Sequence, residues 1–546
     1  MNQAHVHLAR ALREALQSLG VASPRVVLEK PRDPLHGDIA TNAAMIHVKD
    51  IGKPPRAIAE ALLGAIRLDR RLIASESIAG PGFINFALAD DFLRSLVTEA
   101  LREQDNFGKN DELAGRRILI EFVSANPSGP LNVVSARAAA VGDTLVRMFR
   151  TRGASCDAEF YVNDAGNQVR LLGESVYARY EAELGHPMEI PEGGYHGDYI
   201  IDFARELLAA HGHRFHDMPA DQAAQQLGQM AIERHVSWQK ASLEKFRVKF
   251  DRWYHESELR NRGREFQVLE TLRKRDVVYE KDGALYLRTS SFGDQQDWVI
   301  VTRDGRPTYF LPDIAYHRDK FERGYDPVLD ILGPDHHSFI AKMSAGLRAL
   351  GLDADKLEVV LLQHVTLLRD GEPVKMSKRA GKLIEMDELL EEVGTDAARY
   401  FFLLRRTSTP LDFDIELAKK QSDENPVYYV QYAHARIESI FRKAGVPYPE
   451  DGMDLSLLTT SEEMTLLRRI RGFRDMLEDA TGSRDPHAIT VWLREVATQF
   501  HKFYQECRVL TEPPQLQRAR LALCRATQIA LQNGLALCGV NAPKEM

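Results

Sequence analysis

The sequence predicts an α/β protein with three parts: a small α+β unit, a domain built on a covered parallel sheet, and an all-helical end. Three observations lead there. The chain has 546 residues, too many for a single hydrophobic core. A buried-strand pattern, a turn and a helical pattern follow one another from residue 118. Beyond about residue 390, apolar residues recur with the helical period of 3.6 and strand runs are few.

The first part covers residues 1–110. Apolar spacing predicts a helix over 6–19 and another over 56–66. The stretch "SESIAGPGFINFAL" predicts strand structure around a Gly-Pro-Gly turn, and "DDFLRSLVTEALREQ" predicts a helix. These elements together indicate a small α+β unit.

The second part covers residues 111–390 and begins with "RRILIEFVS". The run 118–123 is short, apolar and rich in β-formers, as a buried parallel strand is. The turn "SANPSGP" follows, then a helical pattern from Val134, then the strand-like "DAEFYVND". Strand, helix and strand in this order predict a βαβ unit and a covered parallel sheet.

A mostly helical insertion is expected at about 165–290. Strand signals return at "GALYLRT", "WVIVTRDG", "PTYFLPD" and "VLDILGPDHH", and the sheet is expected to end near "LEVVLLQHVTLL". The third part, residues 391–546, is expected to be helical throughout.

Composition restricts the class of protein. The chain is 44% hydrophobic and 27% charged, which is typical of a soluble globular protein. No apolar run is long enough to span a bilayer, and the N-terminus lacks a signal-peptide pattern. The four cysteines are scattered without a CxxC pair, which favours reduced buried thiols and the cytoplasm and predicts no metal site.

A net charge of −8 argues against a general polyanion binder, but not against an RNA enzyme with a local basic face. Three basic clusters lie at 273–275, 405–406 and 468–474. For each, a solvated helix face is the simpler interpretation and an RNA contact the alternative.

Two stretches carry phosphate-binding chemistry. The strand, turn and helix over 121–150 place a helix N-terminus beyond a parallel strand, where unpaired N–H groups attract phosphate. A plain strand-to-helix turn would look the same. The stretch "GEPVKMSKRAGKLIEMDEL" has lysines that could neutralise a leaving polyphosphate, although a solvated basic loop would also fit.

Two further stretches carry polar side chains beside predicted strands. In "YFLPDIAYH", Tyr309 and Asp313 could hold a cationic substrate; alternatively, Asp313 caps the helix that follows Pro312. In "LGPDHHSF", adjacent His336 and His337 point in different directions, so hydrogen bonding to a ribose or base is favoured over a metal pair.

Together these segments resemble a class I aminoacyl-tRNA synthetase, and specifically an arginyl-tRNA synthetase of the bacterial type. The resemblance covers nearly the whole chain. Its most specific segments, in the family's order, are "HGDIATNAAM", "GPGFINF", "EFVSANPSGPL", "YVNDAG", "YFLPDIAYH", "GPDHH", "KMSKRAG", "GTDAARYFFL" and "NPVYYVQYAHARI".

The resemblance implies a Rossmann-type catalytic domain, an N-terminal domain that binds the outer corner of tRNA, and an all-helical anticodon-binding domain. The implied reaction joins L-arginine to arginine tRNA through an arginyl-adenylate. ATP with magnesium is the implied substrate, with no tightly bound cofactor. The implied protein is a cytoplasmic monomer without a membrane partner.

The resemblance also assigns residues to four roles. The catalytic set is Asn132, Ser135, Lys375 and Lys378. The arginine-binding set is Glu121, Ser124, Asn126, Tyr309 and Asp313, with Tyr309 and Asp313 facing the guanidinium. The ATP-binding set adds Ala125, Pro127, Gly333, Asp335, His336, His337, Met376 and Ser377 to the four catalytic residues. The tRNA-binding set is Phe83, Asn85, Tyr428, Tyr432 and Arg436; among the tyrosines of 428–432 we expect some in the core and one or two stacked on bases.

One segment departs from the family. The first ATP signature usually reads Pro-Leu-His-Val-Gly-His, whereas this chain has "PLNVVS". Asn132 and Ser135 keep hydrogen-bonding groups but not the possible positive charge, and Val134 replaces a glycine that lets nucleotide approach. An active arginyl-tRNA synthetase is the favoured interpretation, because the other segments remain. A catalytically silent paralogue that binds tRNA or arginine is the alternative. A ligase acting on a small molecule would not need the helical end.

Overall fold

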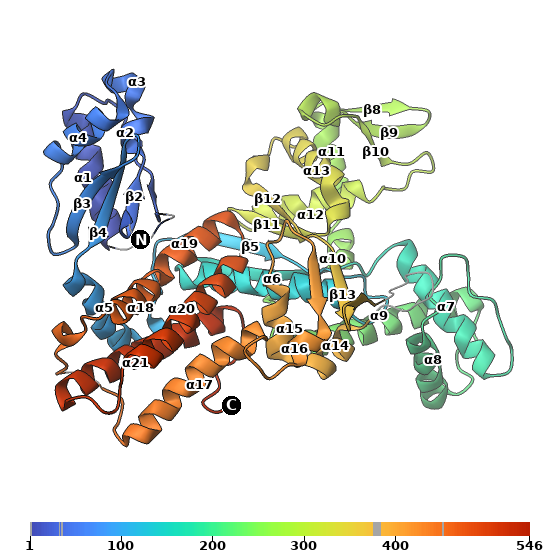
Figure 1. Ribbon diagram of the computed structural model, residues 1–546. Coiled ribbons are helices and arrows are strands. Elements are labelled where there is room, and N and C mark those ends of the chain that lie inside the picture. Colours follow the sequence, from blue (N-terminus) through green and yellow to red (C-terminus); the bar gives the residue numbers. More distant parts are fainter. Residues whose placement is uncertain (1–2, 32, 34–35, 375–383, 450–451) are drawn as a thin grey trace.

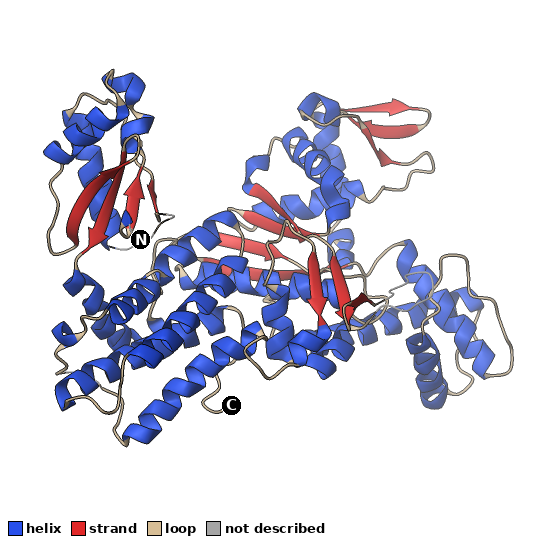
Figure 2. Ribbon diagram, viewed as in Figure 1, coloured by secondary structure: helices blue, strands red, loops and turns tan. Residues whose placement is uncertain are grey.

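The computed structural model describes residues 3–31, 33, 36–374, 384–449 and 452–546. Figure 1 shows the N-terminal domain apart at the upper left, joined through α5 to a bundle of C-terminal helices. The parallel sheet lies near the centre, and two projections extend to the right, one carrying α7 and α8 and the other β8 to β10. Figure 2 shows that most of the chain is helical and that the strands are confined to a few small sheets. In the described part of the chain, no helix is long and apolar enough to cross a membrane.

The N-terminal domain is an antiparallel four-stranded sheet, in the order β1-β2-β4-β3, covered by helices. The predicted Gly-Pro-Gly hairpin is confirmed, with Ala79 paired to Phe83 across the turn. Its elements are α1 Gln3–Ser18, β1 Leu28–Glu29, β2 Ile39–Thr41, α2 Ala43–Ile46, α3 Val48–Ile51, α4 Pro55–Ala65, β3 Ile73–Ala79, β4 Phe83–Leu88 and α5 Asp90–Glu103.

The central domain contains an all-parallel sheet of five strands in the order β12-β11-β5-β6-β7. The chain first extends from β5 through β6 to β7, then returns to the other side of β5 for β11 and β12. The direction therefore reverses between β5 and β11, and ligands bind at such switch points in open α/β sheets. This confirms the predicted covered parallel sheet.

The elements of this domain run from the first parallel strand to the helices that follow it. They are β5 Arg117–Glu121, α6 Val133–Thr151, β6 Ser155–Val162, α7 Asn167–Glu183, α8 Asp198–His211, α9 Ala220–Lys245, β7 Arg252–His255, α10 Glu256–Asn261, α11 Arg264–Lys274, β8 Val278–Lys281, β9 Ala284–Leu287, β10 Trp298–Val301, α12 Phe310–Glu322, β11 Val328–Leu332, α13 His337–Ala349, β12 Leu357–Leu361, β13 Val365–Arg369, β14 Glu372–Pro373, α14 Met386–Val393 and α15 Thr395–Phe402.

One strand prediction is wrong. The stretch 307–313 was expected to be a strand, but α12 begins at Phe310. Only Pro307 forms an isolated bridge, to Val301, before the backbone turns into the helix. A second finding is that β7, the edge strand of the parallel sheet, falls inside the segment expected to be a mostly helical insertion. Three of its four residues are half-buried, so the strand lacks the apolar run that marks a buried strand in the sequence.

The sheet core explains where α6 can lie. Ile118 and Ile120 of β5 are buried, as is Phe122 just beyond the strand. A Cβ atom on Gly142 of α6 would lie 2.2 Å from the Phe122 ring, so only glycine lets the helix cross this closely. The close crossing brings the N-terminus of α6 to the carboxyl end of β5.

The C-terminal part is a helical bundle, as predicted, with one short strand that pairs in parallel with β13. Its elements are β15 Leu411–Asp414, α16 Ile415–Lys419, α17 Pro426–Ala444, α18 Ser461–Arg471, α19 Phe473–Ser483, α20 His487–Glu506 and α21 Pro514–Leu537.

The arginines of 468–474 lie where the bundle meets the N-terminal domain and α5. Arg468 pairs with Asp38 at 2.8 Å, and Arg474 pairs with Glu99 at 2.7 Å. Arg471 is mostly buried, donates to the Phe92 carbonyl and stacks on its ring. Arg468, Arg471 and Arg474 therefore join the bundle to the N-terminal domain and α5, and interdomain packing replaces the solvated-face interpretation for these three residues.

Candidate active site

The backbone reverses sharply at the carboxyl end of β5. Val123 and Ser124 have φ values of 68° and 40°, a left-handed conformation that β-branched residues such as valine rarely adopt. The reversal turns Ser124 back towards the sheet, where its hydroxyl donates to Glu121 at 2.8 Å and accepts from the Tyr161 N–H at 3.0 Å. Strained backbone of this kind is concentrated at functional sites.

Asn132 is the N-cap of α6. Its side-chain oxygen accepts hydrogen bonds from the backbone N–H groups of Val134 at 3.0 Å and Ser135 at 3.1 Å. Asparagine is among the best capping residues. The residue that replaces the first histidine of the signature therefore fixes the start of α6.

Val134 projects into solvent at the start of α6, with 48% of its surface exposed. The side chain does not fill the protein interior, so valine costs nothing in packing at this position. Ser135 is half-buried, and its hydroxyl lies 3.5 Å from the capping oxygen of Asn132.

The lysine-bearing signature, with Lys375, Met376, Ser377 and Lys378, lies outside the described residues. The next described segment of the chain, from residue 384, contacts the start of α6. The Met386 N–H donates to the Leu131 carbonyl at 2.8 Å, and Glu385 forms an isolated bridge with Asn132. The first turn of α14 is thus joined to the residues that begin α6.

Tyr309 and Asp313 lie in the first turn of α12. The N-cap is Tyr309, so the alternative that Asp313 caps this helix is wrong. Tyr309 is 65% exposed, whereas Asp313 is half-buried. The Asp313 carboxylate forms no hydrogen bond or ion pair with any described residue, and burial raises its pKa to about 6. An unpaired carboxylate of this kind is suited to receive a cationic group.

A buried chain of charges lies behind Glu121. Lys320, which has no exposed surface, donates to Glu121 and to Asp330 at 2.7 Å. Burial alone would lower the pKa of Lys320, but the carboxylates of Asp330 and Glu121 raise it above its usual value. Asp330 also accepts from His317 Nε2 at 2.6 Å, and the other ring nitrogen of His317 donates to the Asp313 carbonyl at 2.7 Å. This chain connects Glu121 to the helix turn that carries Asp313.

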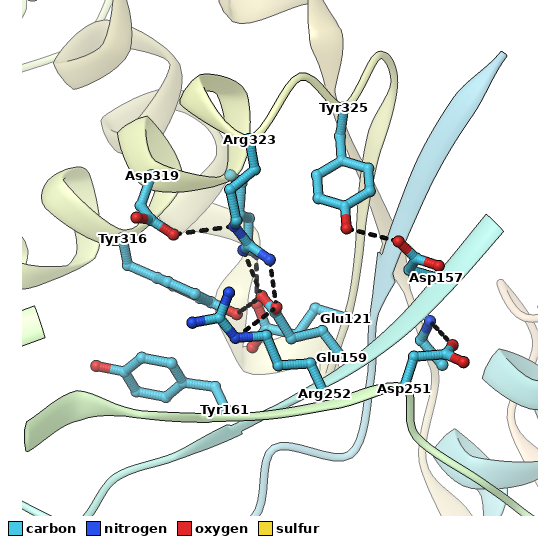
Figure 3. A network of polar contacts seen from close by, with 12 residues as sticks. Glu121, Asp157, Glu159, Tyr161, Asp251, Arg252, Tyr316, Asp319, Arg323 and Tyr325 are labelled. Atoms are coloured by element: carbon cyan, nitrogen blue, oxygen red, sulfur yellow. Dashed lines mark hydrogen bonds and ion pairs between the residues drawn. The ribbon is translucent and has the colours of Figure 1, made fainter. Parts of the chain in front are cut away.

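A second network lies on β6 and is drawn in Figure 3. Glu159 has no exposed surface and accepts from Arg323 at 2.6 Å and from the Tyr316 hydroxyl at 2.7 Å. Figure 3 shows Tyr161 beside Tyr316, and their ring centroids are 4.5 Å apart. The network fixes α12 against the sheet and so fixes the direction in which Asp313 projects.

Two residues of this region were missed by sequence reasoning. They are Tyr161 and Glu256. The pKa of Tyr161 is raised far above its usual value, first by burial and then by the charges of Glu256, Asp313 and Glu121. Three carboxylates therefore surround this phenol. Glu256 is buried and held by Arg260 at 2.6 Å. Tyr161 lies within the "YVNDAG" segment, which was a usable signal; Glu256 carries none, because it stands in a polar helix pattern.

The predicted ATP-binding residues after β11 lie at the other side of the switch point. The strand ends at Leu332, and the turn that follows leaves Asp335, His336 and His337 exposed. Gly333 is half-buried at the strand end. Across the switch point, Ala125 is half-buried, Asn126 exposed and Pro127 buried. The structure therefore brings the two predicted ATP-binding segments to one edge of the sheet, beside Asp313.

The predicted tRNA-binding residues lie in two distant places. Phe83 is half-buried on β4, whereas Asn85 is only 4% exposed. On α17, the rings of Tyr428 and Tyr432 are stacked with centroids 6.2 Å apart, and both are half-buried. Arg436 lies over the Tyr432 ring at 5.7 Å. This cluster also includes His501, which was not singled out from the sequence. The centroid of its ring lies 5.0 Å from that of the Tyr429 ring.

The geometry defines a class of protein. A parallel sheet with a capped helix N-terminus at its switch point, followed by a helical C-terminal bundle, is the architecture of a class I tRNA synthetase. Three family models match the chain: the arginyl tRNA synthetase N-terminal domain over residues 6–88, the catalytic domain of class I (R) tRNA synthetases over 96–402, and the DALR anticodon binding domain over 430–546.

The chain belongs to the arginyl-tRNA synthetase family. It is 45% identical to an arginine–tRNA ligase of Carboxydothermus hydrogenoformans, covering 95% of this chain and 94% of that protein. It is 44% identical to an arginine–tRNA ligase of Geobacillus kaustophilus, covering 98% of each. Its fold matches the structure of Thermus thermophilus arginyl-tRNA synthetase with a TM-score of 0.80 at 23% identity, covering 99% of both chains.

Proposed function

We propose that this protein attaches L-arginine to the terminal adenosine of an arginine tRNA, using ATP with magnesium and an arginyl-adenylate intermediate. The observation that carries the proposal is the Asp313 carboxylate, which is half-buried and has no partner among the described residues. A guanidinium is a planar cation with five donors and is best matched by a carboxylate and an aromatic ring. Tyr309, one helical turn away and 65% exposed, supplies that ring.

The arginine backbone would bind at the reversal after β5. Ser124 and Asn126 offer polar groups there for the α-amino or carboxylate end. Glu121 is already bound by Lys320 and Ser124, so its main task is to hold Ser124 in place while adding negative charge beside the α-amino group.

ATP would bind across the switch point. Ala125, Pro127 and the first turn of α6 face the phosphates, with Asn132 and Ser135 as neutral donors. Gly333, Asp335, His336 and His337 would line the ribose and base. Lys375, Met376, Ser377 and Lys378, outside the described residues, would supply positive charge as pyrophosphate leaves. Magnesium would arrive with ATP and screen its phosphates.

The chemical step needs position and charge more than a covalent catalyst. An arginine carboxylate oxygen attacks the α-phosphorus, and pyrophosphate leaves in line with it. The ribose hydroxyl of the terminal adenosine then attacks the activated carbonyl and releases AMP. Phe83 and Asn85 would contact the outer corner of the tRNA, and Tyr428, Tyr432 and Arg436 would stack on anticodon bases. The protein would act in the cytoplasm and as a monomer.

The decisive experiment supplies the purified protein with arginine, ATP, magnesium and bacterial arginine tRNA, and measures arginyl-tRNA. We expect charging that depends on all four. Lysine in place of arginine serves as the matched control. Bound tRNA without charging above background would instead identify a catalytically silent relative.

A further inference from the structure

Helix α9 lies within the segment expected to be an insertion. It contacts the turn 124–131 between β5 and α6, which is called the signature turn below. His235, Gln239 and Ser242 are spaced four and three residues apart, so they lie along one face of the helix. All three are buried, with exposed fractions of 2% or less. Polar side chains buried on one helix face need specific partners.

The first set of partners is the backbone of the signature turn. The Gln239 amide donates to the carbonyls of Asn126 at 3.0 Å and Gly129 at 2.9 Å. The His235 ring bonds the Pro127 carbonyl at 3.1 Å, and burial lowers the pKa of His235 to about 4, so the ring is neutral with its proton on Nδ1. Three turn carbonyls therefore take their hydrogen bonds from α9.

The second partner is the first turn of α14. Asp387 accepts from the Ser242 hydroxyl at 2.6 Å and from the Trp238 indole at 3.3 Å. The Lys245 ammonium lies 3.7 Å from its other oxygen. Asp387 is therefore tied to α9 by two hydrogen bonds and one ion pair.

The two partners also contact each other. Met386, the residue before Asp387, donates to the Leu131 carbonyl, two residues beyond Gly129 in the chain. Turn, α14 and α9 thus form a closed triangle of hydrogen bonds. A triangle fixes the separation of two elements more firmly than a single contact does.

We propose that Gln239 and Ser242 are positioning residues for ATP: through them α9 fixes the separation between the signature turn and the first turn of α14. Gln239 acts through the backbone carbonyls of the signature turn, and Ser242 acts through Asp387. Neither side chain is proposed to contact substrate. Their effect is on geometry, because a shift of about 1 Å in a phosphate-binding segment can cost up to 100-fold in rate.

The proposal rests on ATP binding at this edge of the sheet, so its test measures ATP affinity directly. ATP with magnesium is titrated into the full-length protein by calorimetry, and KM for ATP is measured by arginine-dependent pyrophosphate exchange in the presence of tRNA. Gln239→Met keeps the volume and removes the donors. We expect its ATP Kd and KM to rise about tenfold, with arginine KM within about twofold of wild type.

Three variants complete the design. Ser242→Ala should raise ATP Kd, and Ser242→Thr, which keeps the hydroxyl, should restore it. Gln229→Met lies on the exposed face of the same helix and should change neither value. Because Gln239 and Ser242 act on one geometry, their double variant should show non-additive effects on ATP Kd.

The outcome that overturns the proposal is equally clear. If Gln239→Met and Ser242→Ala lower thermal stability but leave ATP Kd and KM at wild-type values, α9 only packs the domain together. A wild-type protein that binds ATP but does not charge tRNA would refute the proposed function and leave the ATP Kd comparison fully valid.

Discussion

Asn132 accepts a hydrogen bond from the Ser135 backbone N–H at 3.1 Å, so the two residues that replace the signature histidines are partners of each other. Together they form the N-cap and third residue of α6. The departure from the family pattern is therefore a well-built helix start, with two neutral side chains at the N-terminus of α6.

The first prediction concerns this cap. Asn132→Asp keeps the capping oxygen and should change stability little, whereas Asn132→His should lose about 1 kcal/mol of unfolding free energy, since histidine is a poor cap. With Ser135→His added, pyrophosphate exchange should fall by about tenfold, which corresponds to about 1.4 kcal/mol. Urea unfolding and exchange rates measure the two effects. A large gain in rate would show that the native signature is impaired.

The second prediction concerns pH. Only the ionised Asp313 carboxylate attracts a guanidinium, and its pKa in the free protein is raised to about 6 by burial. Below pH 6, kcat/KM for arginine should therefore fall by about tenfold per pH unit. The profile is measured by exchange between pH 5 and 8, with KM for ATP followed as the control. A kcat/KM that stays level down to pH 5 would contradict the assignment.

A substitution complements the pH profile. Asp313→Ala should abolish arginine use and leave tRNA binding unchanged, because the carboxylate lies far from the α17 cluster in sequence and fold. Arginine affinity is measured by calorimetry and tRNA affinity by filter binding. Unchanged arginine affinity in this variant would refute the guanidinium role.

The third prediction concerns Lys320. Lys320→Met would remove the ammonium shared by the carboxylates of Glu121 and Asp330, which are paired neighbours across β5 and β11. The unfolding free energy should fall by about 3–5 kcal/mol at pH 7. In this variant the carboxylates have raised pKa values, so part of the stability should return as pH falls and they protonate.

The matched control is Lys274→Met. The Lys274 side chain is 72% exposed and pairs with the exposed Glu270 on the same helix, so the change should stay within about 0.5 kcal/mol. Equal losses of unfolding free energy in the two variants would show that the buried ion pairs of Lys320 stabilise the fold no more than an exposed pair does.

The fourth prediction separates packing arginines from RNA-binding ones. Arg471→Gln should lower stability, because a buried guanidinium stacked on Phe92 is lost, while the salt dependence of tRNA binding stays as in wild type. Arg436→Gln should weaken tRNA binding by about 1 kcal/mol, the low end of a stacking contribution. Binding isotherms at several salt concentrations decide between them. A smaller salt slope in Arg471→Gln would make that residue an RNA contact after all.

Sequence reasoning succeeded where the signal is local. The apolar run of β5, the hairpin of β3 and β4, and the long amphipathic helices were all predicted, because each element's own residues define its period. It failed at 307–313, where a β-like composition was overridden by a helix starting at Phe310. It did not foresee β7 either, whose side chains are only half-buried at the sheet edge.

The sequence by itself determined the family, the parallel sheet and the segments that carry chemistry, since these depend on residue order and short-range pattern. Only the tertiary structure decided how those segments meet. It left Asp313 without a partner among the described residues, and it placed Glu256 beside Tyr161. It also paired Arg468, Arg471 and Arg474 with the N-terminal domain and α5, and it set α9 against both the signature turn and α14. The hydrogen bonds of α9 join residues more than 100 positions apart, and a long-range hydrogen bond leaves no periodic mark in the chain that forms it.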